Sequence, residues 1–145
     1  MNKLAESLYR DVPDKSEIYH IANGTVFPSS LNTIQVVNDE KYNGAHKYII
    51  QNSRGYNNDR AEYDDSYTKL NFIQKNEDGT IIPGVQDEQL ILIMLDRAKK
   101  LNAVYPSKWN NIKIHALNIA LDACKGRVKG RIADNIMGQL KADKA

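Results

Sequence analysis

Six consecutive apolar residues, Leu90 to Leu95, constrain the fold of this chain more than any other feature. The good helix formers of residues 96–100 follow, so a helix is favoured over a buried strand. A surface helix carries one apolar stripe. A helix that is apolar almost all round must therefore be covered on several sides. We expect a sheet and a second helix to cover two sides and a second copy of the chain a third.

A second helix is predicted from Lys108, after a break at Tyr105-Pro106-Ser107 and with Ser107 as its N-cap. Gly126 and Gly130 each cost a helix roughly 1 kcal/mol relative to alanine, and they either bend it or let something approach its backbone. The short connection makes the two helices antiparallel neighbours. One apolar stripe is formed at three- and four-residue steps by Trp109, Ile112, Leu117, Ala120, Leu121, Cys124, Val128, Ile132 and Ile136.

The segment before the helices has β character. Asn43-Gly44 and Asn76–Gly79 are predicted turns, because their residues tolerate positive φ angles. Residues 52–66 are predicted to be a polar loop. Strands are predicted where β-branched or alternating apolar residues gather, at residues 33–37, 47–51, 67–74 and 80–82.

These patterns predict an α+β fold, with a small antiparallel β-meander followed by a long antiparallel helical hairpin that oligomerises through its helices. At 145 residues the chain has the size of a single domain. Within it we expect an N-terminal elaboration (residues 1–45), a β part (46–84) and the helical hairpin (85–141).

The composition favours a soluble intracellular protein. The chain has no run of about 18 apolar residues that could cross a bilayer, and its first residues lack the apolar core of a signal peptide. The single cysteine, Cys124, excludes an intramolecular disulfide and a cysteine-built zinc site.

The net charge of +2 hides an uneven distribution. Residues 1–95 hold 9 Lys and Arg against 14 Asp and Glu, whereas residues 96–145 hold 11 against 4. A basic C-terminal third indicates an anionic partner. The alternative is a solvated basic helix face.

The sequence carries no catalytic constellation. It has no glycine-rich phosphate loop. Cys124 belongs to the apolar stripe, which favours a small buried hydrophobe over a nucleophile. We therefore expect no enzyme activity, no cofactor and no metal. The spacing of metal-binding histidines is not found among His20, His46 and His115.

Binding residues are easier to identify. Arg127 and Arg131 are one helical turn apart, so their guanidinium groups could each hold a phosphate or together clamp a diphosphate. Arg54 is a third candidate phosphate ligand, and Tyr56 beside it could stack a base or fill a gap. Tyr105 at the bend could also stack a base. The alternatives are two solvated arginines and a tyrosine that caps the hairpin core.

Several short motifs occur in a fixed order over about residues 46–141. In the β part the motifs are Tyr48–Tyr56, Glu62-Tyr63 and Phe72–Gln74. In the hairpin they are Gln86–Leu90, Asp96-Arg97, Lys100–Asn102, Tyr105–Ser107, Arg127 with Arg131, and Met137–Leu140. Together these motifs resemble the Thoeris anti-defence (Tad) family of phage signal sponges, whose helical hairpin is shared with anti-CBASS cyclic-nucleotide sponges.

The resemblance implies binding without catalysis. Proteins of this family bind the cyclic ADP-ribose isomer that bacterial Thoeris TIR-domain enzymes make, leave it uncleaved and keep it from the downstream effector. The resemblance also implies a homo-oligomer, a dimer or in some relatives a hexamer, in the cytoplasm of the infected bacterial host. Some relatives bind CBASS cyclic oligonucleotides at a separate site, which makes such a second ligand a further expectation.

The family places its ligand pockets between subunits near the hairpin, with arginines on the phosphates and an aromatic residue on the adenine. By motif match, Tyr105 takes the aromatic position. The phosphate ligands are expected among Arg54, Arg127 and Arg131, and further polar contacts to base or ribose from Asn111 and His115.

Two other functions remain open from the residues themselves. The basic C-terminal third also fits a small nucleic-acid-binding regulator, whose binding would weaken steeply with salt. The apolar helices also fit a purely structural oligomerisation module.

Overall fold

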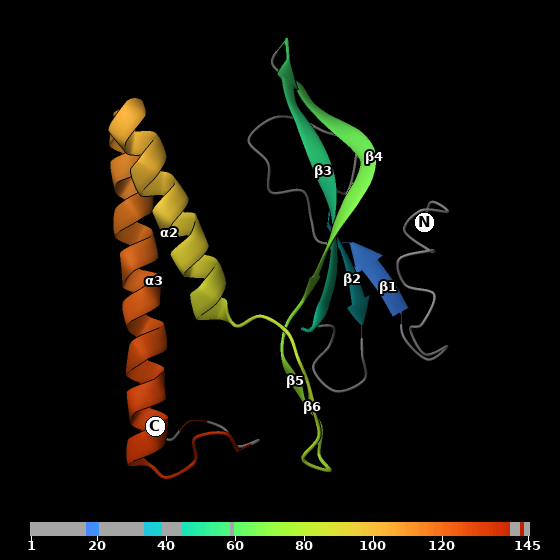
Figure 1. Ribbon diagram of the computed structural model, residues 1–145, viewed down its shortest axis with the longest axis vertical. Coiled ribbons are helices and arrows are strands. Elements are labelled where there is room, and N and C mark those ends of the chain that lie inside the picture. The colour runs from blue at the N-terminus through green and yellow to red at the C-terminus, as the bar shows by residue number, and fades with distance from the viewer. Residues whose placement is uncertain (1–16, 21–33, 39–44, 59, 140–142, 144–145) are drawn as a thin grey trace. The chain divides into compact units, whose positions relative to one another are not determined.

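The computed structural model describes residues 17–20, 34–38, 45–58, 60–139 and 143 (Figure 1). The chain forms two compact units, Met1–Gln74 and Lys75–Ala145, each of which is described by itself. Almost all of the strand residues belong to the first unit and both long helices to the second, so the chain has an α+β fold. The turn predicted at Asn43-Gly44 lies outside the described residues.

The first unit contains a four-stranded antiparallel sheet whose strands pair in chain order. This arrangement is the predicted meander, and it agrees with the strands expected at residues 33–37 and 47–51. The sheet consists of β1 (Glu17–His20), β2 (Ile34–Asn38), β3 (Lys47–Asn57) and β4 (Arg60–Asn71).

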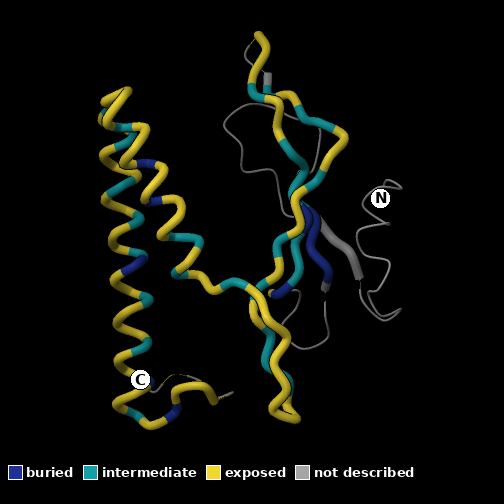
Figure 2. The backbone as a smooth tube through the Cα atoms, viewed as in Figure 1, coloured by how far each residue is buried: buried dark blue, intermediate teal, exposed yellow. Residues whose placement is uncertain are grey.

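The core of this unit lies on β2 and β3. Val36, Val37 and Ile49 are buried there, as β-branched residues in a central pair of strands are expected to be. The rings of Tyr48 and Phe72 meet edge to face, with their centroids 5.6 Å apart. Figure 2 shows this concentration of burial in the lower part of the sheet, while the distal β3–β4 hairpin is largely exposed.

The prediction of a polar loop at residues 52–66 is wrong, because this segment forms most of the β3–β4 hairpin. Within residues 52–66 the two strands lack an apolar face, and hydrogen bonds between polar side chains add to the main-chain pairing of the strands. Asn52 Nδ2 donates to Ser66 Oγ at 2.9 Å, and Thr68 Oγ1 donates to Asn52 Oδ1 at 2.6 Å. A strand of this kind has no hydrophobic alternation from which to predict it.

A two-stranded ribbon, β5 (Gln74–Lys75) with β6 (Ile81–Ile82), precedes the helices. It surrounds the predicted turn at Asn76–Gly79, which is confirmed: Gly79 N donates to Asn76 O at 3.0 Å, and Gly79 has a φ angle of 88°. The last predicted strand therefore pairs with β5 and not with the meander.

The second unit is the predicted antiparallel helical hairpin, α2 (Asp87–Val104) and α3 (Lys108–Ala133). Ser107 is the N-cap of α3, since its Oγ accepts a hydrogen bond from Asn110 N at 3.0 Å. The helix continues without a break through Gly126 and Gly130.

The buried side of the hairpin is narrow. Leu95 and Ala98 of α2 are buried, with Leu121 of α3. Trp109, which the stripe places in the core, is exposed and lies under the Lys108 ammonium, 4.8 Å from the ring centroid. The large exposed apolar side chains of the two helices are Leu92, Ile93, Met94, Leu101, Val104, Trp109, Ile112, Ile119 and Ile132.

A Schellman motif ends α3 earlier than the apolar stripe predicts. Asn135, with a φ angle of 57°, donates from its N to Ile132 O at 3.0 Å, and Ile136 N donates to Arg131 O at 3.0 Å. Ile136 is thus past the helix end, although it is still buried. Among the described residues, no helix is long and apolar enough to cross a membrane.

Candidate functional site

The bend between α2 and α3 is fixed by one amide side chain. Asn102 Nδ2 donates to Asn111 Oδ1 at 2.9 Å, and Asn102 Oδ1 accepts from Ser107 N at 3.1 Å. The side-chain oxygen of Asn111, a predicted ligand contact, is therefore already engaged within the bend.

Tyr105 lies at this bend with a fixed backbone and an exposed ring. Its N donates to Leu101 O at 2.7 Å, and its O accepts from Asn110 Nδ2 at 3.2 Å. The residue is 72% exposed, which argues against a cap on the hairpin core. An aromatic ring held in this way can stack on a base with little loss of conformational entropy.

Arg127 and Arg131 meet on one carboxylate near the C-terminal end of α3. Arg127 Nε donates to Asp143 Oδ2 and Arg131 Nη1 donates to Asp143 Oδ1, each at 2.8 Å. The one-turn spacing thus brings the two guanidinium groups together on a single anion.

The two arginines differ strongly in burial. The Arg127 side chain is 61% exposed, whereas that of Arg131 is 6% exposed. Arg131 Nη2 also donates to two main-chain carbonyls after the helix, Ile136 O at 3.0 Å and Gln139 O at 2.6 Å. Arg131 therefore fastens the segment after α3 as well as binding an anion.

The hydrogen bonds from Arg131 and then Arg127 hold the pKa of Asp143 below its ordinary value of 3.8. The carboxylate is consequently ionised at neutral pH, and it is the anionic partner of the arginine pair.

A cavity of about 260 Å³ lies beside this ion-pair cluster. Two glycines form part of its wall, and a Cβ atom added at Gly126 or Gly130 would meet no atom within 4 Å. The missing side chains thus leave room next to the guanidinium groups. The lining residues are Gly126, Arg127, Gly130, Arg131, Asp134 and Asp143.

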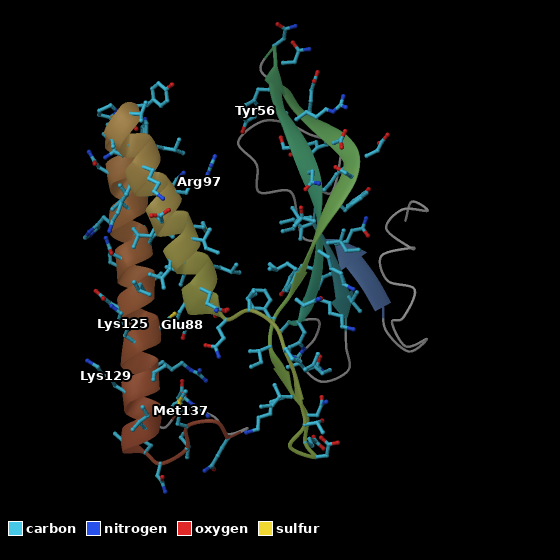
Figure 3. All side chains as sticks on the ribbon, viewed as in Figure 1. Tyr56, Glu88, Arg97, Lys125, Lys129 and Met137 are labelled. Atoms are coloured by element: carbon cyan, nitrogen blue, oxygen red, sulfur yellow. The ribbon has the colours of Figure 1, made fainter. Side chains whose placement is uncertain are left out.

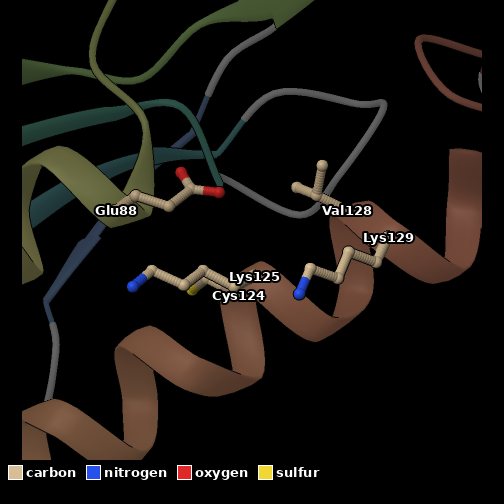
Figure 4. Close-up of a pocket in the computed structure, with 5 residues that line it drawn as sticks. All are labelled: Glu88, Cys124, Lys125, Val128 and Lys129. Carbon is tan, nitrogen blue, oxygen red and sulfur yellow. The ribbon is translucent and has the colours of Figure 1, made fainter.

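A second cavity, of about 230 Å³, lies between the start of α2 and α3. Figure 4 shows Glu88 of α2 on one side and Lys125 and Lys129 of α3 on the other, around the apolar Cys124 and Val128. Cys124 is half-buried. Lys125 and Lys129 lie at the same level of α3 as the arginine pair. Their ammonium groups add to the positive electrostatic potential there, but they lack the fork of donors with which a guanidinium group binds a phosphate.

Arg54 and Tyr56 belong to the other unit, on β3 rather than on a loop. Arg54 Nε donates to Asp64 Oδ1 at 2.9 Å, and the side chain is two-thirds exposed. Tyr56 extends from the distal part of the hairpin (Figure 3) and is exposed. A hydrogen bond from Ser66, reinforced by Arg54, lowers the pKa of Asp64 below its ordinary value of 3.8.

The structure thus brings together only part of the predicted site. Arg127 and Arg131 lie side by side, but Tyr105 is at the opposite end of α3. At ~1.5 Å per residue, the helix from Lys108 to Arg131 is about 35 Å long. His115 is exposed near the start of the helix. The association of Arg54 and Tyr56 with these residues stays a prediction.

Asp143 and Asn102 were not foreseen as site residues. Asp143 is the one acidic residue in the basic tail Lys141–Lys144, which is a weak signal for a partner of the two arginines. Asn102 follows a run of helix formers and precedes the bend, where an amide often satisfies free main-chain groups.

A comparison with protein-family models finds no match to this chain. No curated protein matches its sequence either. Within the part of the chain that the structure describes, no group of three or more His, Cys, Asp or Glu side chains is arranged to hold a metal ion.

Proposed function

We propose that this protein is a phage anti-defence sponge, which binds a cyclic ADP-ribose isomer made by Thoeris TIR enzymes and keeps it from the downstream effector. The observation that carries the proposal is the single carboxylate held between Arg127 and Arg131. Guanidinium groups bind carboxylate and phosphate oxygens with the same fork of donors. The pair that holds Asp143 can therefore hold a phosphate group.

Sequestration requires affinity and no chemical step. A sponge lowers the concentration of free signal by mass action, provided that it is present in at least the amount of the signal. The charge distribution supports such a role, because the C-terminal third that carries the arginine pair is basic and the signal is anionic.

The complete binding site combines residues of two copies of the chain. Tyr105 and Arg131 are separated by most of the length of α3, which is far more than one nucleotide spans. Two α3 helices that pair antiparallel bring the bend of one copy next to the arginine end of the other. A ligand between the copies can then contact the aromatic ring of one and the arginines of the other.

The exposed apolar side chains of the hairpin supply the surface for this pairing. Ile93 of α2 and Ile119 of α3 are more than half exposed, although each lies in a long, well-formed helix. Contact between two copies removes this apolar surface from water, and its burial favours association. We therefore propose a homo-oligomer that forms through the hairpin.

Heat release followed by mass spectrometry tests the function. The protein is incubated with cyclic ADP-ribose isomers, washed free of unbound ligand and heated, and the released compounds are identified. We expect one intact isomer in an amount close to that of the protein. Recovery of no nucleotide, or only of hydrolysed product, would contradict the sponge.

Matched variants show whether the arginine pair carries the binding. Arg127→Ala should release much less ligand than the wild type. Lys125→Ala is the control, because it removes the same charge two residues away on the other side of α3, at a residue that does not line the cavity beside the arginine pair. Equal loss in both variants would indicate nonspecific attraction by the basic surface, as in a nucleic-acid-binding protein.

A further inference from the structure

The carboxylate of Asp143 lies where an anionic ligand of the arginine pair has to bind. Its two oxygens accept from different side chains, Oδ2 from Arg127 Nε and Oδ1 from Arg131 Nη1. A phosphate group that bridges the two arginines would use the same donor atoms. The carboxylate and the phosphate therefore exclude each other.

We propose that Asp143 is a built-in competitor, which leaves Arg127 and Arg131 when a phosphate group of the ligand takes its place. The inference rests on the proposed function for the identity of the ligand. The exchange itself is required of any ligand that brings a phosphate group to this pair.

The burial of the three side chains makes the exchange feasible. Asp143 is about half exposed and Arg127 more so, and both can move into solvent. Arg131 is 6% exposed and keeps its bonds to the carbonyls of Ile136 and Gln139 when the carboxylate leaves. One arginine thus stays in place as the fixed half of the site, while the other adjusts to the ligand.

The charges in the cavity change with the exchange. Arg127 and Arg131 are balanced by Asp134 and Asp143, which also line the cavity, so the four side chains together are neutral. Departure of Asp143 leaves the other three side chains with a charge of +1. An incoming phosphate group then meets attraction in place of balanced charge.

This competition gives the site selectivity for strongly anionic groups. A ligand with one carboxylate gains no more from the arginines than Asp143 already does. A diphosphate offers more oxygens and more negative charge to the same donors. Asp143 therefore disfavours singly charged metabolites and admits a diphosphate.

Titration with inorganic pyrophosphate tests the competitor. The key variant is Asp143→Asn. The control is Asp96→Asn, which removes the same charge from the same unit at the exposed pair with Lys100. An ion pair with at least one exposed partner shifts an equilibrium by a few fold. Loss of the pairs with Arg127 (exposed) and Arg131 (buried) should therefore tighten pyrophosphate binding by about threefold to tenfold in the Asp143→Asn variant. Asp96→Asn should change it by less than about twofold.

Several results would overturn the competitor. One is pyrophosphate binding that is no tighter in Asp143→Asn than in Asp96→Asn, and another is no pyrophosphate binding by any variant. A second measurement uses the wild type alone and does not depend on the folding of a variant. Pyrophosphate should shift the NMR signals of both Arg127 Nε–H and the Asp143 carboxyl carbon; a shift of the first without the second also overturns the proposal.

The choice of probe separates this inference from the proposed function. Tighter pyrophosphate binding by Asp143→Asn, together with no binding of any cyclic ADP-ribose isomer, supports the competitor and contradicts the sponge. Binding of an isomer by the wild type with no gain in Asp143→Asn supports the sponge and contradicts the competitor.

Discussion

Arg131 and Asp143 form an ion pair of 2.8 Å in which the arginine is almost completely buried and the carboxylate is half exposed. Arg131, the buried partner, also donates hydrogen bonds to two main-chain carbonyls. Asp143, the half-exposed partner, accepts hydrogen bonds from Arg127 and Arg131. This asymmetry makes Arg131 a structural residue as well as a ligand-binding one, and it decides which substitutions report on binding.

The first prediction concerns the two arginines. Arg131→Ala should lower the free energy of unfolding of the hairpin by about 2 kcal/mol, because it leaves the carbonyls of Ile136 and Gln139 without their charged donor. Arg127→Ala should cost less than about 1 kcal/mol, since its ion pair is exposed. Urea denaturation followed by circular dichroism measures both.

Equal destabilisation by the two substitutions would contradict the distinction between a buried and an exposed arginine. With the predicted result, Arg127→Ala is the better variant for binding measurements, because it reduces affinity in a protein that remains folded.

The second prediction concerns the open wall of the cavity. Gly130→Ala should stabilise the hairpin by about 0.5–1 kcal/mol, since alanine is the better helix former and its Cβ meets no neighbouring atom. The same methyl group occupies space beside the arginines and should weaken ligand binding. A variant that is more stable and binds as well as the wild type would show that the ligand does not approach this part of the helix.

The third prediction concerns pH. The arginine pair lowers the pKa of Asp143 in the folded state below its ordinary value of 3.8. Its contribution to stability is therefore fully present above 3.8 and is lost as the pH falls through the folded-state pKa. Thermal unfolding should show the wild type more stable than Asp143→Asn at neutral pH, with the difference vanishing in strong acid. A difference that is independent of pH would contradict the ion pair.

The fourth prediction concerns assembly. Ile119→Glu places a charge on the exposed apolar surface of α3 and should weaken self-association by at least about tenfold, because a charge buried in an apolar interface is costly. Asn118→Glu adds the same charge at the neighbouring position and is the control. Sedimentation equilibrium measures both. A wild-type monomer, or equal effects of the two substitutions, would contradict assembly through this surface.

The helices could be predicted because their signals are local. The apolar run Leu90–Leu95, the N-cap at Ser107 and the break at Pro106 each depend on a few neighbouring residues. The proximal parts of β3 and β4 were predicted from residues 47–51 and 67–74, but the distal part of the hairpin, residues 52–66, could not be predicted in the same way. Its main-chain pairing is accompanied by polar side-chain bonds such as that of Asn52 with Ser66, which link residues that are distant in the sequence.

The candidate site was predictable in its donors but not in their environment. The one-turn spacing of Arg127 and Arg131 is visible in the sequence. The burial of Arg131 arises from carbonyls in the turn after α3, and main-chain groups leave no signal in residue identity. The separation of Tyr105 from the arginines follows from the unbroken length of α3, which the two glycines made uncertain.

Calorimetric titration of the wild-type protein with a cyclic ADP-ribose isomer tests the central claim most directly. We predict saturable binding of at least one isomer with a Kd of about 1 μM or lower, and intact ligand at the end of the titration. The absence of saturable binding for every isomer, or the appearance of hydrolysed ligand, would contradict the proposal that this protein sequesters the signal without chemistry.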